Sequence, residues 1–91
     1  MSALFTEFRL KDVVLKNRIV ASPMCQYQAD DGMVNDWHLS HYAGLARGGC
    51  ALVVVEATAV SPEGRITPGC LGLWSDAHVE GLARVAALIR A

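Results

Sequence analysis

Ser22-Pro23-Met24-Cys25-Gln26-Tyr27 marks the point at which an apolar run ends and polar side chains begin. The residues before it, 18–21, predict a strand, and Pro23 lacks the backbone donor that a central strand would need to continue. A thiol at Cys25 and a phenol at Tyr27 therefore follow the carboxyl end of a strand. Because parallel sheets and barrels carry their binding sites at this end, we expect the functional site to begin here.

A helix is expected after this first strand, which we place over residues 18–22. Asn35 or Asp36 can cap its first turn with a side-chain oxygen, and Gly48-Gly49 can end it as a glycine just beyond the last turn does. Between these limits, apolar residues recur at helical spacing: Leu39, Tyr42, Ala43 and Ala46. The pattern predicts a helix with one narrow apolar face.

A second strand and helix follow the first pair. Residues 50–55 form an unbroken apolar run bounded by glycine, which predicts a strand buried on both faces. The segment 56–74 is rich in Pro and Gly and predicts a long irregular loop over the mouth of the sheet. The next helix is capped by Ser75 or Asp76, and its expected buried face consists of Val79, Leu82, Ala83, Ala86 and Ile89. Two such units with apolar strands predict an α/β fold with a parallel sheet or barrel.

The N-terminal part of the chain predicts a β-hairpin. Residues 8–10 and 13–15 are rich in apolar side chains and flank Lys11-Asp12, a polar pair suited to a tight turn.

Composition narrows the classes of function. The formal net charge is −1, with acidic and basic residues interspersed, so no basic patch supports nucleic-acid binding. No apolar run approaches the roughly 18 residues that span a bilayer, and we see no signal-peptide pattern. Three cysteines at irregular spacing argue against a disulfide framework. We therefore expect a cytoplasmic protein without a nucleic-acid or membrane partner.

Five short motifs occur in order along the chain: Pro23-Met24-Cys25-Gln26-Tyr27, Asn35-Asp36-Trp37-His38, Gly44-Leu45-Ala46-Arg47-Gly48-Gly49, Val54-Val55-Glu56-Ala57-Thr58-Ala59-Val60 and Pro62-Glu63-Gly64-Arg65-Ile66. Together they resemble the old yellow enzyme family, in its thermophilic-like branch. The resemblance implies a (β/α)8 TIM barrel that binds FMN and takes reducing equivalents from NADPH or NADH. It implies reduction of the C=C bond of α,β-unsaturated carbonyl compounds by hydride transfer from flavin N5.

The length of the chain fits only part of such a barrel. A complete barrel needs roughly 250 residues, whereas this chain has 91. We expect residues 1–91 to be the N-terminal part of a single FMN-binding domain, namely the hairpin and the first two βα units. A hydrophobic content of 53% also suits a piece of a larger core. The full-length protein is expected to be a homo-oligomer acting on a small-molecule enone, and residues 1–91 alone to be inactive.

The resemblance also implies roles for individual residues. Those expected to contact the flavin are Ser22, Pro23, Met24, Cys25 and Ala57. Cys25 would lie against flavin O4 and N5, where a weak S–H donor tunes the reduction potential. Tyr27 would contact the substrate and hydrogen-bond its carbonyl. Without the resemblance, Cys25 is more simply a small buried hydrophobe and Tyr27 a half-buried aromatic residue.

Other interpretations of the chain involve different residues. His38 and His41 lie three residues apart on the first helix near Asp36, as in some metal-dependent hydrolases, but they lack the flanking pattern of known zinc helices, so we expect no metal. Glu56 ends a buried strand, where a carboxylate must be paired or exposed, and we interpret it as structural. A further alternative is a non-catalytic fragment whose open strand edges pair with a partner chain.

Overall fold

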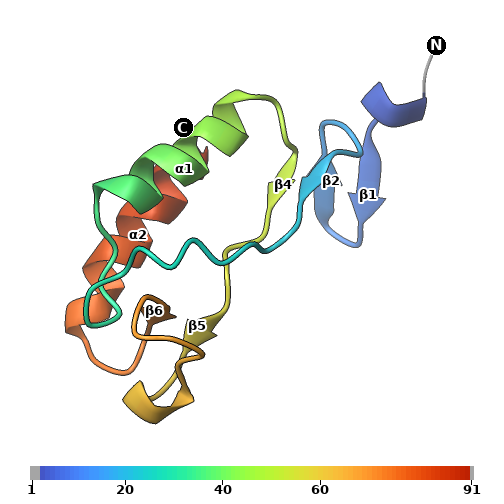
Figure 1. Cartoon of the computed structure of the whole chain (residues 1–91). Coiled ribbons are helices and arrows are strands. Elements are labelled where there is room, and N and C mark those ends of the chain that lie inside the picture. Colours follow the sequence, from blue (N-terminus) through green and yellow to red (C-terminus); the bar gives the residue numbers. More distant parts are fainter. Residues whose placement is uncertain (1–2, 91) are drawn as a thin grey trace.

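The computed structural model describes residues 3–90 and confirms the α/β class. Its elements are a 3-10 turn η1 (Ala3–Phe5), β1 (Phe8–Leu10), β2 (Val13–Leu15), β3 (Val20–Ala21), α1 (Asp36–Arg47), β4 (Leu52–Val53), β5 (Thr58–Ala59), a 3-10 turn η2 (Pro62–Gly64), β6 (Leu71–Gly72) and α2 (Ala77–Arg90). The two helices lie side by side, and the β1–β2 hairpin projects at the N-terminal end (Figure 1). Neither described helix is long and apolar enough to cross a membrane.

The predicted hairpin is confirmed. β1 and β2 are antiparallel, with Phe8 opposite Leu15, and Lys11-Asp12 forms the turn between them. Lys11 has a φ of 52°, in the left-handed region that tight hairpin turns require. Phe8 also lines a groove of about 300 Å³ together with Val20 and Leu52, the first residues of β3 and β4. The hairpin therefore lies at the amino ends of the parallel strands.

β3 and β4 form the parallel pair on which the fold is built, with Val20 opposite Leu52. Two further backbone hydrogen bonds of 3.0 Å extend the pairing beyond these short strands. Both strands occupy only part of the predicted ranges, 18–22 and 50–55. Leu52 and Val54 are 38% and 39% exposed, so the expectation of a strand buried on both faces is wrong for the described residues. The reason is that β4 pairs only with β3 in this part of the chain.

The segment 56–74 is more ordered than its composition predicts. β5 and β6 pair in parallel, with Thr58 opposite Leu71. The backbone N–H of Gly72 donates to the carbonyl of Gly32 at 3.0 Å, which ties this segment to the loop after β3. Strands of two residues are too short to show an alternating pattern, so no periodicity predicts them.

α1 begins and ends where the sequence predicts. The side chain of Asn35 accepts from the N–H of Trp37 at 3.0 Å, and Nδ1 of His38 accepts from the N–H of Asn35 at 3.1 Å. This is a capping box in which histidine takes the place usually held by Glu or Gln. At the other end, Gly49 has a φ of 112°, the conformation that a terminating glycine provides.

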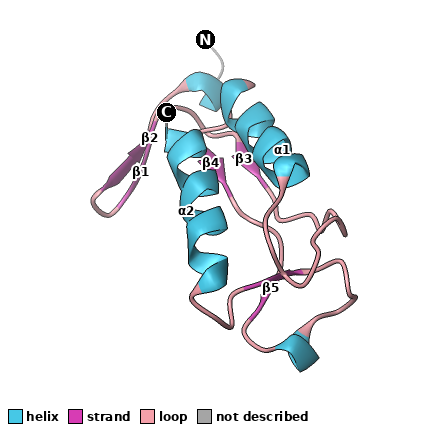
Figure 2. Cartoon of the chain, turned by 90° about the vertical axis from the view of Figure 1, so that its left-hand side faces the viewer, coloured by secondary structure: helices cyan, strands magenta, loops and turns pink. Residues whose placement is uncertain are grey.

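α2 lies beside α1, and both cover the same side of the strands (Figure 2). Its buried residues are His78 and Val85, whereas Val79, Ala83 and Ala86 of the predicted face are exposed. That part of the prediction is wrong. In the described structure α2 packs against α1, and helical spacing by itself does not reveal which neighbour a helix meets.

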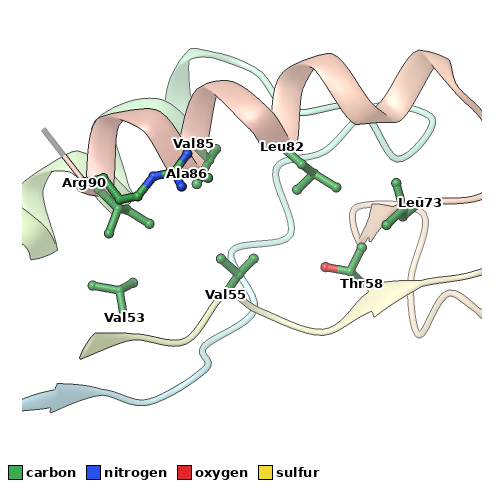
Figure 3. Close-up of a pocket in the computed structure, with 9 residues that line it drawn as sticks. Val53, Val55, Thr58, Leu73, Leu82, Val85, Ala86 and Arg90 are labelled. Atoms are coloured by element: carbon green, nitrogen blue, oxygen red, sulfur yellow. The ribbon is translucent and has the colours of Figure 1, made fainter. Parts of the chain in front are cut away.

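An open apolar groove of about 440 Å³ separates α2 from β4 and β5. Val53 of β4 and Val55, which lies between β4 and β5, face it from one side, and Leu82 and Ala86 of α2 face it from the other (Figure 3). In a closed barrel, a further strand beside β4 would cover such a groove. We therefore interpret the groove as a surface for core packing. It does not include the strand ends at which the sequence predicts the functional site.

Residues 1–91 expressed alone should aggregate or remain poorly folded. Large apolar side chains such as Phe5, Val60 and Ile66 are 66%, 80% and 69% exposed, and each described strand pairs with a single neighbour, which leaves its other edge unpaired. Size-exclusion chromatography and amide NMR spectra would measure this. A monomer with dispersed amide signals and a cooperative melt would contradict the expectation.

Candidate functional site

The residues after β3 lie at the carboxyl end of the β3–β4 pair, as the sequence predicts. Ser22, Pro23 and Met24 are exposed, and Cys25 is a half-buried free thiol. Ala57 follows the second strand and is also exposed. We refer to residues 22–27 and Ala57 as the strand-end edge.

One hydrogen bond joins the two halves of the strand-end edge. The backbone N–H of Gln26 donates to Oε2 of Glu56 at 3.3 Å. Because Gln26 follows Cys25 and Glu56 precedes Ala57, this bond brings the two segments expected to contact a flavin to one place. The side chain of Gln26 accepts from Trp37 Nε1 at 3.0 Å, which ties the same turn to α1.

Tyr27 adopts an uncommon backbone conformation. Its φ is 56°, in the left-handed region that few non-glycine residues occupy, and its side chain is 55% exposed. Gly69 packs against this backbone so closely that a Cβ there would lie 2.7 Å from the Tyr27 carbonyl oxygen. The N–H of Ala29 donates to the Gly69 carbonyl at 3.0 Å. Contacts from the 67–72 segment thus support the turn that presents the Tyr27 ring.

A buried pair, Tyr42 and Glu56, lies behind the strand-end edge. These residues are 1% and 2% exposed. The Tyr42 hydroxyl donates to Oε1 of Glu56 at 2.6 Å and accepts from the Glu56 N–H at 3.0 Å. Burial, followed by the hydrogen bond to Glu56, raises the pKa of the Tyr42 phenol. The expectation that Glu56 must be paired or exposed is confirmed. Its partner is Tyr42, a residue that helical spacing predicts on the apolar face of α1.

His38 is wholly buried, with 0% of its surface exposed. Its Nδ1 accepts the Asn35 N–H, which places the proton of the neutral ring on Nε2. Burial lowers the pKa of His38, attraction by Glu56 opposes this effect, and His41 adds to it. His38 therefore belongs to the core and to the cap of α1.

The residues considered for a metal site do not form one in the described structure. Among residues 3–90, no group of three or more His, Cys, Asp or Glu side chains could hold a metal ion. His41 contacts the Tyr42 ring edge-on at a centroid distance of 4.8 Å. The absence of a metal in the whole protein stays a prediction.

Comparison with known proteins identifies the family. The model of the NADH:flavin oxidoreductase / NADH oxidase family matches residues 3–91. The chain belongs to this family. The resemblance to old yellow enzymes in the five sequence motifs is thereby confirmed.

Curated relatives include two NADPH dehydrogenases. That of Halalkalibacterium halodurans is 51% identical over 90 residues, which are 97% of this chain and 27% of the relative. That of Listeria monocytogenes serotype 4a is 54% identical over 87 residues, covering 93% of this chain and 26% of the relative. The chain thus spans about a quarter of the length of the curated relatives it matches.

Solved structures support the same fold. Morphinone reductase in complex with tetrahydroNAD superimposes with a TM-score of 0.86 at 27% identity, over 99% of this chain and 24% of that one. The old yellow enzyme homologue from Zymomonas mobilis gives 0.85 at 30% identity, over 98% and 25%. These neighbours are TIM barrels, so the described elements correspond to part of such a barrel without closing it.

The experiments below use a chimera that we call the completed barrel. In it, this chain replaces the matching segment of the Halalkalibacterium halodurans NADPH dehydrogenase, whose remaining three quarters supply the rest of the barrel.

The completed barrel should lose stability as the pH falls below about 6.5, the ordinary pKa of histidine. Because the pKa of His38 is lowered in the folded state, the unfolded chain binds its proton first. The stabilisation is complete above pH 6.5 and is lost as the pH falls towards the lowered pKa. His38→Gln keeps an acceptor for the Asn35 N–H and should flatten this dependence. Urea unfolding midpoints between pH 5 and 8 would measure it.

His41→Gln is the matched control, because His41 is half-buried and takes no part in the cap. Because His41 contributes the smallest of the effects on the His38 pKa, this variant should weaken the pH dependence slightly and much less than His38→Gln does. If the urea unfolding midpoint changes equally with pH in the parent and in His38→Gln, His38 does not titrate as its environment implies.

Proposed function

We propose that this chain is the N-terminal part of an FMN-dependent NAD(P)H oxidoreductase that reduces the C=C bond of α,β-unsaturated carbonyl compounds. The observation that carries the proposal is the strand-end edge. Two parallel strands end beside each other, and the Gln26–Glu56 hydrogen bond joins the segments that follow them. Membership in the flavin oxidoreductase family and the names of the curated relatives support it.

The strand-end edge offers the kinds of contact that suit a flat ring with polar atoms along its edge. Its residues are accessible, Ala57 is small enough for close approach, and Cys25 offers a weak S–H donor. We propose that the flavin-contacting residues are Ser22, Pro23, Met24, Cys25 and Ala57. When bound, FMN supplies the two-electron chemistry that connects oxidation of NAD(P)H to reduction of the alkene.

Cys25 and Tyr27 have separate roles in this proposal. Cys25 tunes the cofactor through its thiol. A nucleophilic cysteine needs a base within hydrogen-bonding reach, and in the described structure no hydrogen bond joins Cys25 to a histidine. Tyr27 presents an exposed phenol from the same turn, where it can donate a hydrogen bond to a substrate carbonyl.

The remaining properties of the whole protein are predictions from the sequence. They are a homo-oligomeric state, a cytoplasmic location and the use of either NADPH or NADH. The alternative of a fragment that pairs with a partner chain would use the open edge of β4. We favour the barrel, because a further strand beside β4 would cover both this edge and the groove below α2.

The completed barrel should bind FMN, accept electrons from NADPH under anaerobic conditions, and pass them to 2-cyclohexen-1-one. Absorbance of the bound flavin would follow each stage, and residues 1–91 alone should do none of this. A folded chimera that retains no flavin would refute the proposal. Retention of flavin with no reoxidation by the enone would refute the substrate class alone.

Cys25→Ala in the completed barrel should shift the reduction potential of FMN by tens of millivolts while turnover persists. For a two-electron couple, about 30 mV corresponds to roughly 1.4 kcal/mol, the size of a hydrogen bond to a charged group. Potentiometric titration and stopped-flow measurement of both half-reactions would test this. Cys50→Ala is the control, because Cys50 is also half-buried but lies outside the strand-end edge.

Complete loss of turnover, with FMN bound and its potential unchanged, would contradict the tuning role of Cys25. It would indicate that the thiol takes part covalently.

A further inference from the structure

The proposed function uses the Gln26–Glu56 hydrogen bond as a link between two segments, but it assigns no task to the buried pair of Tyr42 and Glu56 itself. Both oxygens of the Glu56 carboxylate are engaged, Oε1 by the Tyr42 hydroxyl and Oε2 by the Gln26 N–H. Tyr42 is on α1 and Glu56 follows β4, so both belong to the core. The Gln26 amide belongs to the strand-end edge. A rigid interior pair therefore holds one backbone group of the site.

The amide that Glu56 holds is the peptide bond between Cys25 and Gln26. A peptide unit is planar and includes the Cα atoms of both residues. Fixing the direction of its N–H therefore limits the positions that the Cα of Cys25 and its thiol can take. Glu56 thus acts on the one side chain of the edge for which we propose a tuning role.

The same hydrogen bond supports the uncommon turn that follows. Tyr27 has a φ of 56°, a backbone conformation that is strained for a residue other than glycine. Such a conformation persists only where its surroundings hold it on both sides. Gly69 packs against the Tyr27 backbone on one side, and Glu56 holds the preceding residue on the other.

A purely structural role does not explain why this pair is polar. Burying a carboxylate is costly, and apolar side chains of similar volume can fill such a space without that cost. What the pair gains over apolar residues is the backbone amide at the strand-end edge. The polar character of the pair therefore links the core to the position of Cys25.

We propose that Glu56 and Tyr42 are positioning residues, which orient the Cys25–Gln26 peptide and so set the Cys25 thiol against the flavin. The inference rests on the proposed function, because it assigns the pair a part in that same site. Tyr42 fixes Glu56 from α1, and Glu56 fixes the peptide. Neither side chain needs to touch the cofactor.

A double-mutant cycle in the FMN-loaded completed barrel tests this. Glu56→Gln and Tyr42→Phe are each made in the parent and in Cys25→Ala, and the FMN reduction potential is measured by potentiometric titration. Each single change should alter the ratio of affinities for reduced and oxidised FMN at least tenfold, which is about 30 mV. In the Cys25→Ala background, the same substitution should shift the FMN potential by less than a third of that amount, because the thiol that the pair positions is absent.

Val85→Ala is the matched control for general loss of stability. Val85 is 2% exposed on α2 and does not belong to the strand-end edge. This variant should lower the melting temperature while the FMN potential stays at the parent value. The control separates a positioning role from a merely structural one.

Two results would overturn the inference. If Glu56→Gln and Tyr42→Phe both leave the FMN reduction potential at the parent value, the pair does not act on the site. Shifts of equal size in the two backgrounds would show that Glu56 acts by its charge and not through Cys25. If Glu56→Gln fails to fold, Tyr42→Phe decides, since it removes only one hydroxyl. A parent chimera that binds no FMN would instead refute the proposed function.

Discussion

The parallel pairing of β3 with β4 is the constraint on which the rest of the structure depends. Parallel neighbours need a long crossover, and α1 with its flanking loops supplies it. Because both strands run in the same direction, their carboxyl ends meet at one edge. Residues 22–27 and Ala57 are thereby brought together although they are far apart in the chain. Membership in the flavin oxidoreductase family supports the proposal that this edge contacts a flavin.

Histidine performs the same structural task at the start of both helices. In α1, Nδ1 of His38 accepts the Asn35 N–H, and in α2, Nδ1 of His78 accepts the Ser75 N–H at 3.2 Å. With Nδ1 used as an acceptor, Nε2 of His78 donates to the Asp31 carbonyl at 3.0 Å. The His78 ring therefore joins a helix start to the loop at Asp31, whereas Nε2 of His38 is buried without a hydrogen-bond partner in the described structure.

The incorrect expectations about burial have a common physical cause. A pattern of apolar residues predicts which side chains are buried in the complete folded protein. It does not predict which neighbouring element covers each of them. Leu52 and Val79 have the character of core residues yet are 38% and 52% exposed. In a barrel of the family's type, further strands and helices would pack on these surfaces. The apolar pattern therefore identifies residues suited to a core, but it does not predict that they are exposed in this part of the chain.

Local chemistry by itself determined the hairpin turn at Lys11-Asp12, the start of α1 at Asn35 and its end at Gly49, because each depends on interactions between residues close in sequence. It also located the strand-end edge from the position of Pro23. Only the tertiary structure decided the rest. The hydrogen bonds from Tyr42 and Gln26 to Glu56 join residues 14 and 30 positions apart, and the strands β5 and β6 are too short to leave a pattern. Such contacts depend on how α1 and the strands pack, which no local sequence signal encodes.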